Sequence, residues 1–384
     1  MSVPRFWRFN RERYALRGVR CPHCNMVMIS PRSVCPTCAQ GSEAGIPASR
    51  IPAPSLMPAN VEDRRTDPSI TISVIIPAHN TQSTIGQTLT TVTCQEVNVP
   101  YEVIVVDSST DSTPRLVREQ FPMVQLLYNE TRMQSGAARN LGIQKARGKL
   151  IAFTDANCVV SSHWLQQLVD GHVQHPDCAA IGGPIVNGNQ EHTLCWAGYL
   201  AEFNAHLPVG DTPHEVDHIS TGNIAYKRWV FERYGGFPGN EMVEHVALLF
   251  NRMLHARGER LLFDPHVVVA LLPPISLQEF LVHQRTIGRG TVQAMRRLSE
   301  IAGANLVRHR LLAVLSTPTI VMIKFVRNSL RFIRWSFGTT LRHPLLLPLF
   351  GLGLAAWGLG FAGEALIGET CEGVWHENRS GLWA

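Results

Sequence analysis

Two side chains with oxygen ligands follow an apolar run near the middle of the chain. The stretch IAFTDANC, residues 151–158, places Asp155 and Asn157 one residue apart. Carboxylate and amide oxygens bind hard cations such as Mg²⁺ or Mn²⁺, which can bridge phosphates and neutralise charge on a leaving group. Such sites more usually hold two acids, and an amide contributes no charge, so the pair predicts weakened metal binding. The alternative is that Asn157 only caps a turn.

Polar residues also follow two earlier apolar runs. The first run ends in Pro77-Ala78-His79-Asn80, and the second ends in Asp107, with Asp111 four residues on. Between these and Asp155, the stretch SGAARNLG contains Arg139, whose planar guanidinium suits a pyrophosphate or a base. No GxGxxG follows the first run and no GxxxxGK[ST] occurs, which excludes the usual dinucleotide and triphosphate loops.

The elements that would position these side chains alternate along the chain. Apolar β-rich runs predict strands, and the stretches between and after them predict helices. The expected strands are 72–78, 101–107, 124–129 and 149–155, and the expected helices are 84–95, 113–121, 136–146 and 163–173. Continuous apolar strands with helical crossovers indicate an α/β fold, Rossmann-like, with a mostly parallel sheet and flanking helices. Ligands bind such sheets at the carboxyl ends of the strands, where these polar residues would meet.

Four of the nine cysteines form two CxxC pairs near the N-terminus. CPHC contains Cys21 and Cys24, and CPTC contains Cys35 and Cys38. Four thiolates at this spacing predict a closed, structural Zn site. A disulfide pairing is the alternative, although the other five cysteines are scattered and nothing indicates export.

The N-terminal stretch as a whole, 1–38, resembles the helix plus rubredoxin-like zinc ribbon that precedes an OB domain in acyl-CoA-associated scaffold proteins. No OB domain follows here, so the resemblance implies that the ribbon docks a protein partner. Residues 39–69 are rich in Pro and Ala and lack an apolar period, which predicts a linker.

The C-terminal region is basic and apolar. Eleven Arg or Lys occur from Arg285 to Arg342 against the single acid Glu300, in a chain that is 45% hydrophobic and 17% charged. Residues 344–363 carry no charge and are long enough to span a bilayer, whereas 311–323 is short, contains a proline and predicts an interfacial segment unless it extends through the basic residues that follow. A buried helical hairpin in a soluble protein is the alternative. We therefore expect a membrane partner, no nucleic acid, and a basic amphipathic and transmembrane region over 291–384.

Several segments together resemble family 2 glycosyltransferases of the GT-A fold, over about 70–290. They are SVIIPAHN, EVIVVDSSTDST, GAARNLGIQKARGKLIAFTDAN, STGNIAYKRWVFERYGGF and, more weakly, VEHVALL with RGERLLFDP. The resemblance implies inverting transfer of a sugar from a nucleotide-sugar donor, with UDP favoured. It implies that Asp107 holds the base and that TDAN, in the place of an Asp-x-Asp motif, holds ribose and Mg or Mn.

The resemblance also implies roles for residues further along the chain. The general base falls on His245, with Glu244, or Glu241 one turn earlier, as alternatives. Gln284, Arg285 and Arg289 correspond to a segment placed over the donor pyrophosphate. The full Gln-x-x-Arg-Trp signature of processive members is absent. The acceptor side would be lined by Gly222 and Asn223.

Two other classes of function are also weighed. HEVDH, residues 214–218, matches the zinc-protease pattern HExxH, but Pro213 and the β-branched residues that follow disfavour the helix it needs. With Asn157 and His245 in place of acids, the chain could instead be an inactive GT-A-fold scaffold or ligand-binding subunit docked through the ribbon. A reduced zinc site, the absence of a signal peptide over residues 1–20 and the basic belt predict an inner (cytoplasmic) membrane location with the catalytic domain cytoplasmic.

Overall fold

The computed structural model describes most of the chain after residue 70. The described residues are 71–203, 211–238, 245–273, 276–297 and 305–367, together with the backbone of two short strands, β1 (Val19–Arg20) and β2 (Val27–Met28). The chain divides into two units, Met1–Glu62 and Asp63–Ala384. In the first unit β1 and β2 pair antiparallel, with Val19 opposite Met28. The four CxxC cysteines lie outside the described residues, and so do the zinc ribbon that they predict and the linker that follows it.

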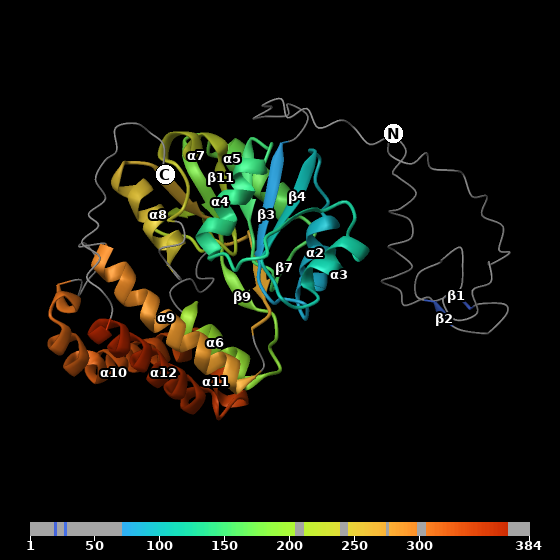
Figure 1. The fold of residues 1–384 in the computed structure, drawn as a ribbon. Coiled ribbons are helices and arrows are strands. Elements are labelled where there is room, and N and C mark those ends of the chain that lie inside the picture. The colour runs from blue at the N-terminus through green and yellow to red at the C-terminus, as the bar shows by residue number, and fades with distance from the viewer. Residues whose placement is uncertain are drawn as a thin grey trace, which may run out of the picture. The chain divides into compact units, whose positions relative to one another are not determined.

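The second unit contains an eight-stranded mixed sheet in the order β10-β12-β8-β11-β6-β3-β4-β5 (Figure 1). Neighbours β6, β3, β4 and β5 are parallel, as the sequence predicts, whereas β11 is antiparallel to both β6 and β8. The expectation of a mostly parallel sheet is therefore confirmed for strands β6, β3, β4 and β5. The sheet as a whole is mixed, because β11 and β10 are antiparallel to their neighbours. The strands are β3 (Ile72–Ala78), β4 (Tyr101–Asp107), β5 (Gln125–Tyr128), β6 (Leu150–Phe153), β8 (Cys178–Gly182), β10 (His214–Glu215), β11 (Ile224–Lys227) and β12 (Arg260–Phe263).

Helices cover both faces of this sheet because its central strands are apolar on both sides. Along β4, Val103 and Val105 belong to one buried cluster and Ile104 and Val106 to the other, which is the two-residue alternation of a strand. The flanking helices are α2 (Ile85–Thr93), α3 (Thr113–Gln120), α4 (Ser135–Lys145), α5 (Trp164–Gln174), α7 (Arg228–Tyr234) and α8 (Val246–Ala256). The four helices and four strands expected from sequence before residue 175 all form, with ends that differ by one or two residues.

A smaller sheet lies next to the carboxyl end of β6. It has the order β7-β13-β9, where β7 is Cys158–Val160, β9 is Ile185–Asn187 and β13 is Val269–Leu271. Strand β7 begins directly after Asn157, whose carbonyl oxygen accepts a 2.7 Å hydrogen bond from the amide of Leu272. The smaller sheet therefore fixes the backbone that carries Asp155 and Asn157.

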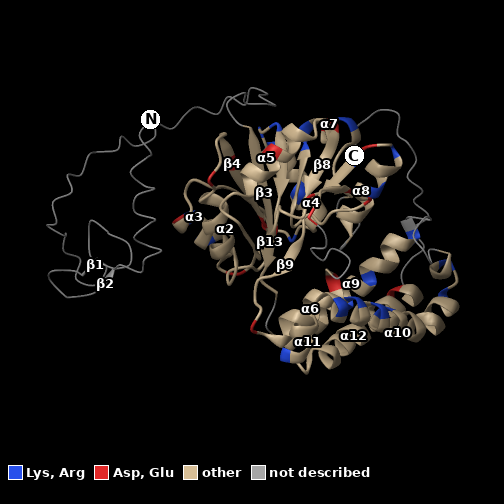
Figure 2. Ribbon diagram, turned by 180° about the vertical axis from the view of Figure 1, so that it is seen from behind, with Lys and Arg blue, Asp and Glu red and all other residues tan. Residues whose placement is uncertain are grey.

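Five further helices and a 3₁₀ turn form a helical layer in the same unit. They are α6 (Thr193–Glu202), α9 (Leu277–Arg297), the turn Leu306–Arg308, α10 (Arg310–Trp335), α11 (Phe337–Arg342) and α12 (Leu346–Ile367). Figure 2 shows Lys and Arg along α9, α10 and α11. Within the described residues, α10 and α12 are long and apolar enough to cross a membrane, by length and composition only.

The segment 311–323 extends through the basic residues that follow it, which is the alternative that the sequence left open. It continues through Lys324, Arg327, Arg331 and Arg334 as one helix of 26 residues that contains Pro318. The basic residues therefore belong to the same helix as the apolar segment.

Candidate active site

The polar residues after β3, β4 and β6 lie at one edge of the sheet. Ala78 at the end of β3 is opposite Asp107 at the end of β4, and Ile75 of β3 is opposite Phe153, two residues before Asp155. Parallel strands carry these ends to the same side, which is where α/β sheets bind ligands. The structure therefore brings His79, Asn80, Asp107 and Asp155 to one rim.

Asp107 is fully buried and only half satisfied. Its Oδ1 accepts a 2.9 Å hydrogen bond from the Ser109 amide and another from the Ser109 hydroxyl. Its Oδ2 is buried without a hydrogen-bond partner among the described residues. Burial raises the pKa of Asp107, and the two Ser109 hydrogen bonds oppose that rise. An unpaired buried acceptor is costly, so Oδ2 is placed to accept a hydrogen bond from a ligand N–H.

The loops after β3 and β4 are joined by hydrogen bonds. His79 Nδ1 lies 2.8 Å from the Ser108 carbonyl oxygen, the Asn80 amide donates to Ser109 Oγ at 2.7 Å, and the Thr110 amide donates to Asn80 Oδ1 at 2.9 Å. Asn80 has a positive φ of 53°, which asparagine tolerates better than most residues. His79 and Asn80 thus hold the loop beside Asp107, and half-buried Pro77 precedes them in β3.

Arg139 reaches the rim from α4. Its Nη2 lies 2.6 Å from Asp155 Oδ1, and the side chains are 5% and 36% exposed. The Arg139 Nε is also buried without a partner among the described residues. A buried guanidinium with a free N–H beside a partly exposed carboxylate can bind an anionic ligand while it orients Asp155.

The Asp155 carboxylate can also reach a cation. Oδ1 faces Arg139, while a Cβ added to Gly222 would lie 3.1 Å from Oδ2, so glycine keeps that approach open. Asn157 is half-buried two residues further on. Asn157 Oδ1 accepts a weak 4.0 Å contact from the Cys158 thiol. A carboxylate and an amide supply the oxygen ligands that Mg²⁺ or Mn²⁺ prefers, and phosphates and water would supply the rest. Among the described residues no group of three His, Cys, Asp or Glu is arranged around a metal.

Asn223 does not face an acceptor, contrary to the sequence expectation. It is fully buried, and its Nδ2 donates to the carbonyls of Pro184 at 3.0 Å and Val267 at 2.6 Å. Its Oδ1 accepts a 2.9 Å hydrogen bond from Trp164 Nε1. Asn223 is therefore a structural residue because all its polar atoms are engaged, whereas Gly222 next to it lies at the Asp155 carboxylate.

His245 precedes α8 and faces α9. Its Nε2 lies 3.2 Å from Thr291 Oγ1, and its backbone has a φ of 64°. Thr291 donates its own proton to the Ile287 carbonyl at 2.8 Å, so Thr291 Oγ1 accepts from His245 Nε2–H and Nδ1 is left with the lone pair. Burial lowers the pKa of His245, and the Lys324 charge lowers it further. Glu241 and Glu244 lie outside the described residues.

The segment expected over the donor pyrophosphate lies within α9. Gln284 is 1% exposed and donates to Glu202 Oε1 of α6 at 2.8 Å, so its assignment as a donor contact is corrected to a helix-packing role. Arg289 Nε lies 3.2 Å from Glu364 Oε2 of α12, and Arg285 is exposed. A pyrophosphate contact by Arg285 or Arg289 remains a prediction.

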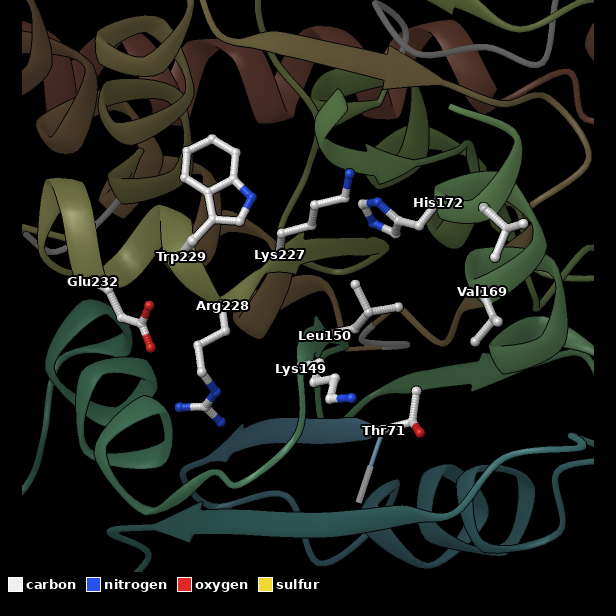
Figure 3. Close-up of a pocket in the computed structure, with 10 residues that line it drawn as sticks. Thr71, Lys149, Leu150, Val169, His172, Lys227, Arg228, Trp229 and Glu232 are labelled. Carbon is white, nitrogen blue, oxygen red and sulfur yellow. The ribbon is translucent and has the colours of Figure 1, made fainter. Parts of the chain in front are cut away.

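A pocket of about 510 Å³ lies away from this rim (Figure 3). Thr71 precedes β3, Lys149 precedes β6, and Lys227 at the end of antiparallel β11 is opposite Leu150, so the pocket is at the amino ends of the parallel strands. Two of its three cations bind backbone carbonyls: Arg228 donates to Gly148 and Ala146, and Lys227 donates to Pro176. Because the pocket lies at the amino ends of the strands, we do not assign it to the donor.

The HExxH match is not a zinc-protease site. His214 and Glu215 form the edge strand β10, paired with Phe263 and Leu262. The motif requires one helical turn to place both imidazoles on the same side. The strand excludes that geometry, as the neighbouring residues predict.

Two of the contacts that shape the site were not singled out from sequence. Ser109 satisfies Asp107 Oδ1, and Thr291 orients His245 from a helix 46 residues away. The Asp-x-Ser spacing of 107–109 is a local signal for the first contact, because Asp side chains bond the amide two residues on. The second contact has no sequence signal because it depends on how α9 packs.

Comparison with known proteins agrees with this geometry. Residues 73–235 match the profile of Glycosyl transferase family 2, a segment that runs from β3 to the end of α7. Glycosyltransferase AglE of Haloferax volcanii is 29% identical over 230 residues, covering 58% of this chain and 73% of that protein. Glucosyl-dolichyl phosphate glucuronosyltransferase of the same organism is 24% identical over 215 residues, covering 50% of this chain and 66% of that protein.

A solved structure shares the fold. Mannosyltransferase PcManGT from Pyrobaculum calidifontis, in complex with GDP-Man and Mn²⁺, superimposes with a TM-score of 0.52 and 20% identity, covering 79% of this chain and 89% of that one. The chain therefore has a GT-A fold. The chain carries a family 2 glycosyltransferase domain, and it is a glycosyltransferase.

Proposed function

We propose that this protein is a membrane-associated, inverting glycosyltransferase that uses a nucleotide-sugar donor and a lipid-linked acceptor. The observation that carries the proposal is that two buried, unpartnered polar atoms lie at the same rim. One is a carboxylate oxygen and the other is a guanidinium N–H. These are Asp107 Oδ2 and Arg139 Nε. A nucleoside diphosphate offers both an N–H and an anion, so it would satisfy both atoms.

The donor would lie across the ends of β3, β4 and β6. Asp107 Oδ2 accepts the imide N–H of a uracil or the N–H of a guanine, and UDP is the favoured donor nucleotide. Arg139 and the Asp155 carboxylate, held 2.6 Å apart, position the ribose and the pyrophosphate. A Mg²⁺ or Mn²⁺ held by Asp155 and Asn157 would neutralise charge on the departing phosphates.

Transfer with inversion requires a base on the opposite side of the sugar from the nucleotide. His245, held neutral by its lowered pKa, has its Nε2–H bonded to Thr291, so Nδ1 would take the proton of the acceptor hydroxyl. The acceptor oxygen then bonds to the anomeric carbon as the bond from that carbon to the phosphate oxygen breaks. Glu244 is the alternative base.

The acceptor class is proposed from the helical layer and the relatives. A relative that is 24% identical is a glucosyl-dolichyl phosphate glucuronosyltransferase. The helices α10 and α12 together with the basic residues around them suit a membrane on which such an acceptor would be presented. We place the domain on the cytoplasmic leaflet and assign the CxxC ribbon to zinc and to a protein partner.

The test is a transfer assay with the full chain in detergent. UDP- and GDP-sugars would be offered with polyprenyl-phosphate glycolipids and, as a matched alternative, with soluble oligosaccharides, and the product's anomeric configuration would be determined by NMR. Transfer to the lipid with inverted configuration is expected. Transfer only to the soluble sugars would contradict the proposal of a lipid-linked acceptor. A product with retained anomeric configuration would contradict the inverting mechanism and the role of His245 as its base.

A further inference from the structure

The exposed apolar side chains of the protein are concentrated on the helical layer. Apart from Met123, Tyr128 and Val173, every large apolar side chain that is strongly exposed among the described residues lies between 277 and 367. We call the apolar face the surface made by Leu315, Met322, Val326 and Leu330 of α10 with Leu352 and Leu359 of α12, which are 44–77% exposed. Residues 315, 322, 326 and 330 recur at helical spacing along α10, and residues 352 and 359 do so along α12. Exposed apolar side chains gathered in this way mark surfaces that bind a membrane or another protein.

Helix α12 is covered along its length by a charged helix. A Cβ on Gly353 would lie 2.4 Å from the ring of Phe280, and a Cβ on Gly360 would lie 2.0 Å from the Arg285 carbonyl oxygen. Farther on, Arg289 pairs with Glu364. The contacts advance in the same direction on both helices, so α9 runs parallel to α12 at backbone contact.

This packing decides whether α12 can cross a bilayer. A crossing α12 would carry α9 to the same depth, together with exposed Arg285 and Arg289, the latter with a side chain that is 58% exposed. Charged side chains inside hydrocarbon are costly unless they face protein or water. The length and composition of α12 permit it to cross a membrane. Its packing against α9, which carries Arg285 and Arg289, disfavours that orientation.

Helix α6 imposes the same limit because it joins the helical layer to the catalytic domain. It follows strand β9, and its Trp196 packs against Phe332 of α10 with ring centroids 5.8 Å apart. Trp196, Leu346 and Phe350 share one buried cluster. Helices α10 and α12 are thus packed on the catalytic domain and do not stand clear of it.

From these contacts we propose that α10, α11 and α12 lie in the plane of the membrane interface and do not cross it. The apolar face is immersed in one leaflet, a mode that rests on the membrane association proposed above. Exposed Arg327, Arg331, Arg334 and Arg342 lie on α10 and α11 and suit anionic headgroups. That charge distribution favours lipid over a second copy of the chain, since identical basic residues repel.

The first experiment measures which side of the membrane α11 faces. Gly338 is exposed, with nothing within 4 Å of an added Cβ, so Gly338→Cys is tolerated sterically. His255→Cys, at an exposed position on α8, reports the catalytic-domain side. Membrane vesicles containing each full-length variant would be treated with an impermeant maleimide on the side where the catalytic domain lies. The labelled peptides would be identified by mass spectrometry.

Labelling of both cysteines from the same side is expected for an in-plane layer. A hairpin that crosses the membrane places α11 on the opposite side, so labelling of His255→Cys alone, with Gly338→Cys reached only after detergent, would overturn the proposal. Recovery of the protein in the soluble fraction as a dimer would overturn it too, because the apolar face would then be covered by a second copy.

The second experiment tests the apolar face directly. Leu315→Glu with Met322→Glu should lower flotation with phosphatidylcholine–phosphatidylglycerol vesicles by about tenfold or more, because two immersed side chains become charged. The matched control is Val173→Glu, a valine that is 73% exposed on α5 and should leave flotation unchanged. Unchanged flotation of the double variant would overturn the assignment. UDP and GDP binding in detergent, measured on the same samples, reports separately on the donor site.

Discussion

The guanidinium of Arg139 lies 2.6 Å from the carboxylate of Asp155, and this pair links helix α4 to the end of strand β6. The arginine is almost fully buried, while the carboxylate is one-third exposed and faces the Cα of Gly222. The arrangement leaves the buried Nε–H of Arg139 without a partner among the described residues, and the Asp155 Oδ2 oxygen faces Gly222. In the proposed donor site these two groups would meet a metal-bound diphosphate.

Removal of the arginine should weaken donor binding. Arg139→Ala is expected to lower UDP affinity by about tenfold to a hundredfold, the range for one lost charged hydrogen bond, and Arg139→Lys should recover only part of it. Isothermal calorimetry measures the change. Arg147→Ala, which breaks a surface pair with Glu102, is the control and should leave UDP binding unchanged. Equal binding by Arg139→Ala and wild type would remove Arg139 from the site.

A second carboxylate should strengthen the metal site. Asn157→Asp places a charge where the amide now lies, so the Mn²⁺ concentration for half-maximal activity is expected to fall by about tenfold, with Asn157→Ala raising it. A titration of Mn²⁺ at fixed donor concentration gives both values. If neither variant shifts the midpoint, Asn157 is a turn residue and not a ligand.

The acid limb of activity should report on His245. Because burial and the Lys324 charge lower the His245 pKa, the imidazole remains neutral below pH 6.5, and kcat/KM should fall only at a pH under that of free imidazole. His245→Gln should lower kcat by about a hundredfold or more, whereas His255→Gln, on the helix that follows His245, should not. An unchanged profile in His245→Gln together with a loss in Glu244→Gln would assign the base to Glu244.

Thr291 supplies a separate test of the tautomer. Thr291→Val removes the acceptor of His245 Nε2–H and should lower kcat with little change in KM for the donor, while Thr291→Ser keeps the oxygen and should restore kcat. Loss of kcat in both variants would indicate a packing role only.

Protein stability should depend on His172. Burial lowers its pKa to about 4, so between pH 6.5 and 4 the unfolded chain binds a proton that the folded chain does not. The free energy of unfolding should therefore be highest above pH 6.5. It should fall by about 3 kcal/mol as the pH falls from 6.5 to 4, because protonation of His172 favours the unfolded chain. Denaturant unfolding at several pH values measures the slope, and His172→Gln should flatten it. Parallel slopes for the variant and wild type would show that His172 does not control acid stability.

Much of the nucleotide-binding half was predictable from sequence because its signals are local. Strands β3 and β4 are continuous apolar runs that end at polar residues, and their expected bounds match those of the structure. Since parallel strands end at the same edge, the meeting of Asp107 and Asp155 follows from the strand assignment alone.

The remaining features depend on contacts distant in sequence. Antiparallel β11 is inserted between β6 and β8, and nothing in IAYK specifies its direction. Asn223 and Gln284 both read as ligand contacts, but each is buried against partners from other elements. The sequence left open whether 311–323 ends at residue 323 or extends through the basic residues, and the structure shows one helix that packs against α12.

The most direct test of the donor site is calorimetric binding of UDP and GDP to the detergent-solubilised full chain, with and without Mn²⁺. Wild type would be compared with Asp155→Ala and with Asp170→Ala, an exposed aspartate on α5. We predict Mn²⁺-dependent binding of UDP that is lost in Asp155→Ala and kept in Asp170→Ala. Absence of nucleotide binding to wild type under every condition would contradict a working donor site and would favour a scaffold docked to a partner.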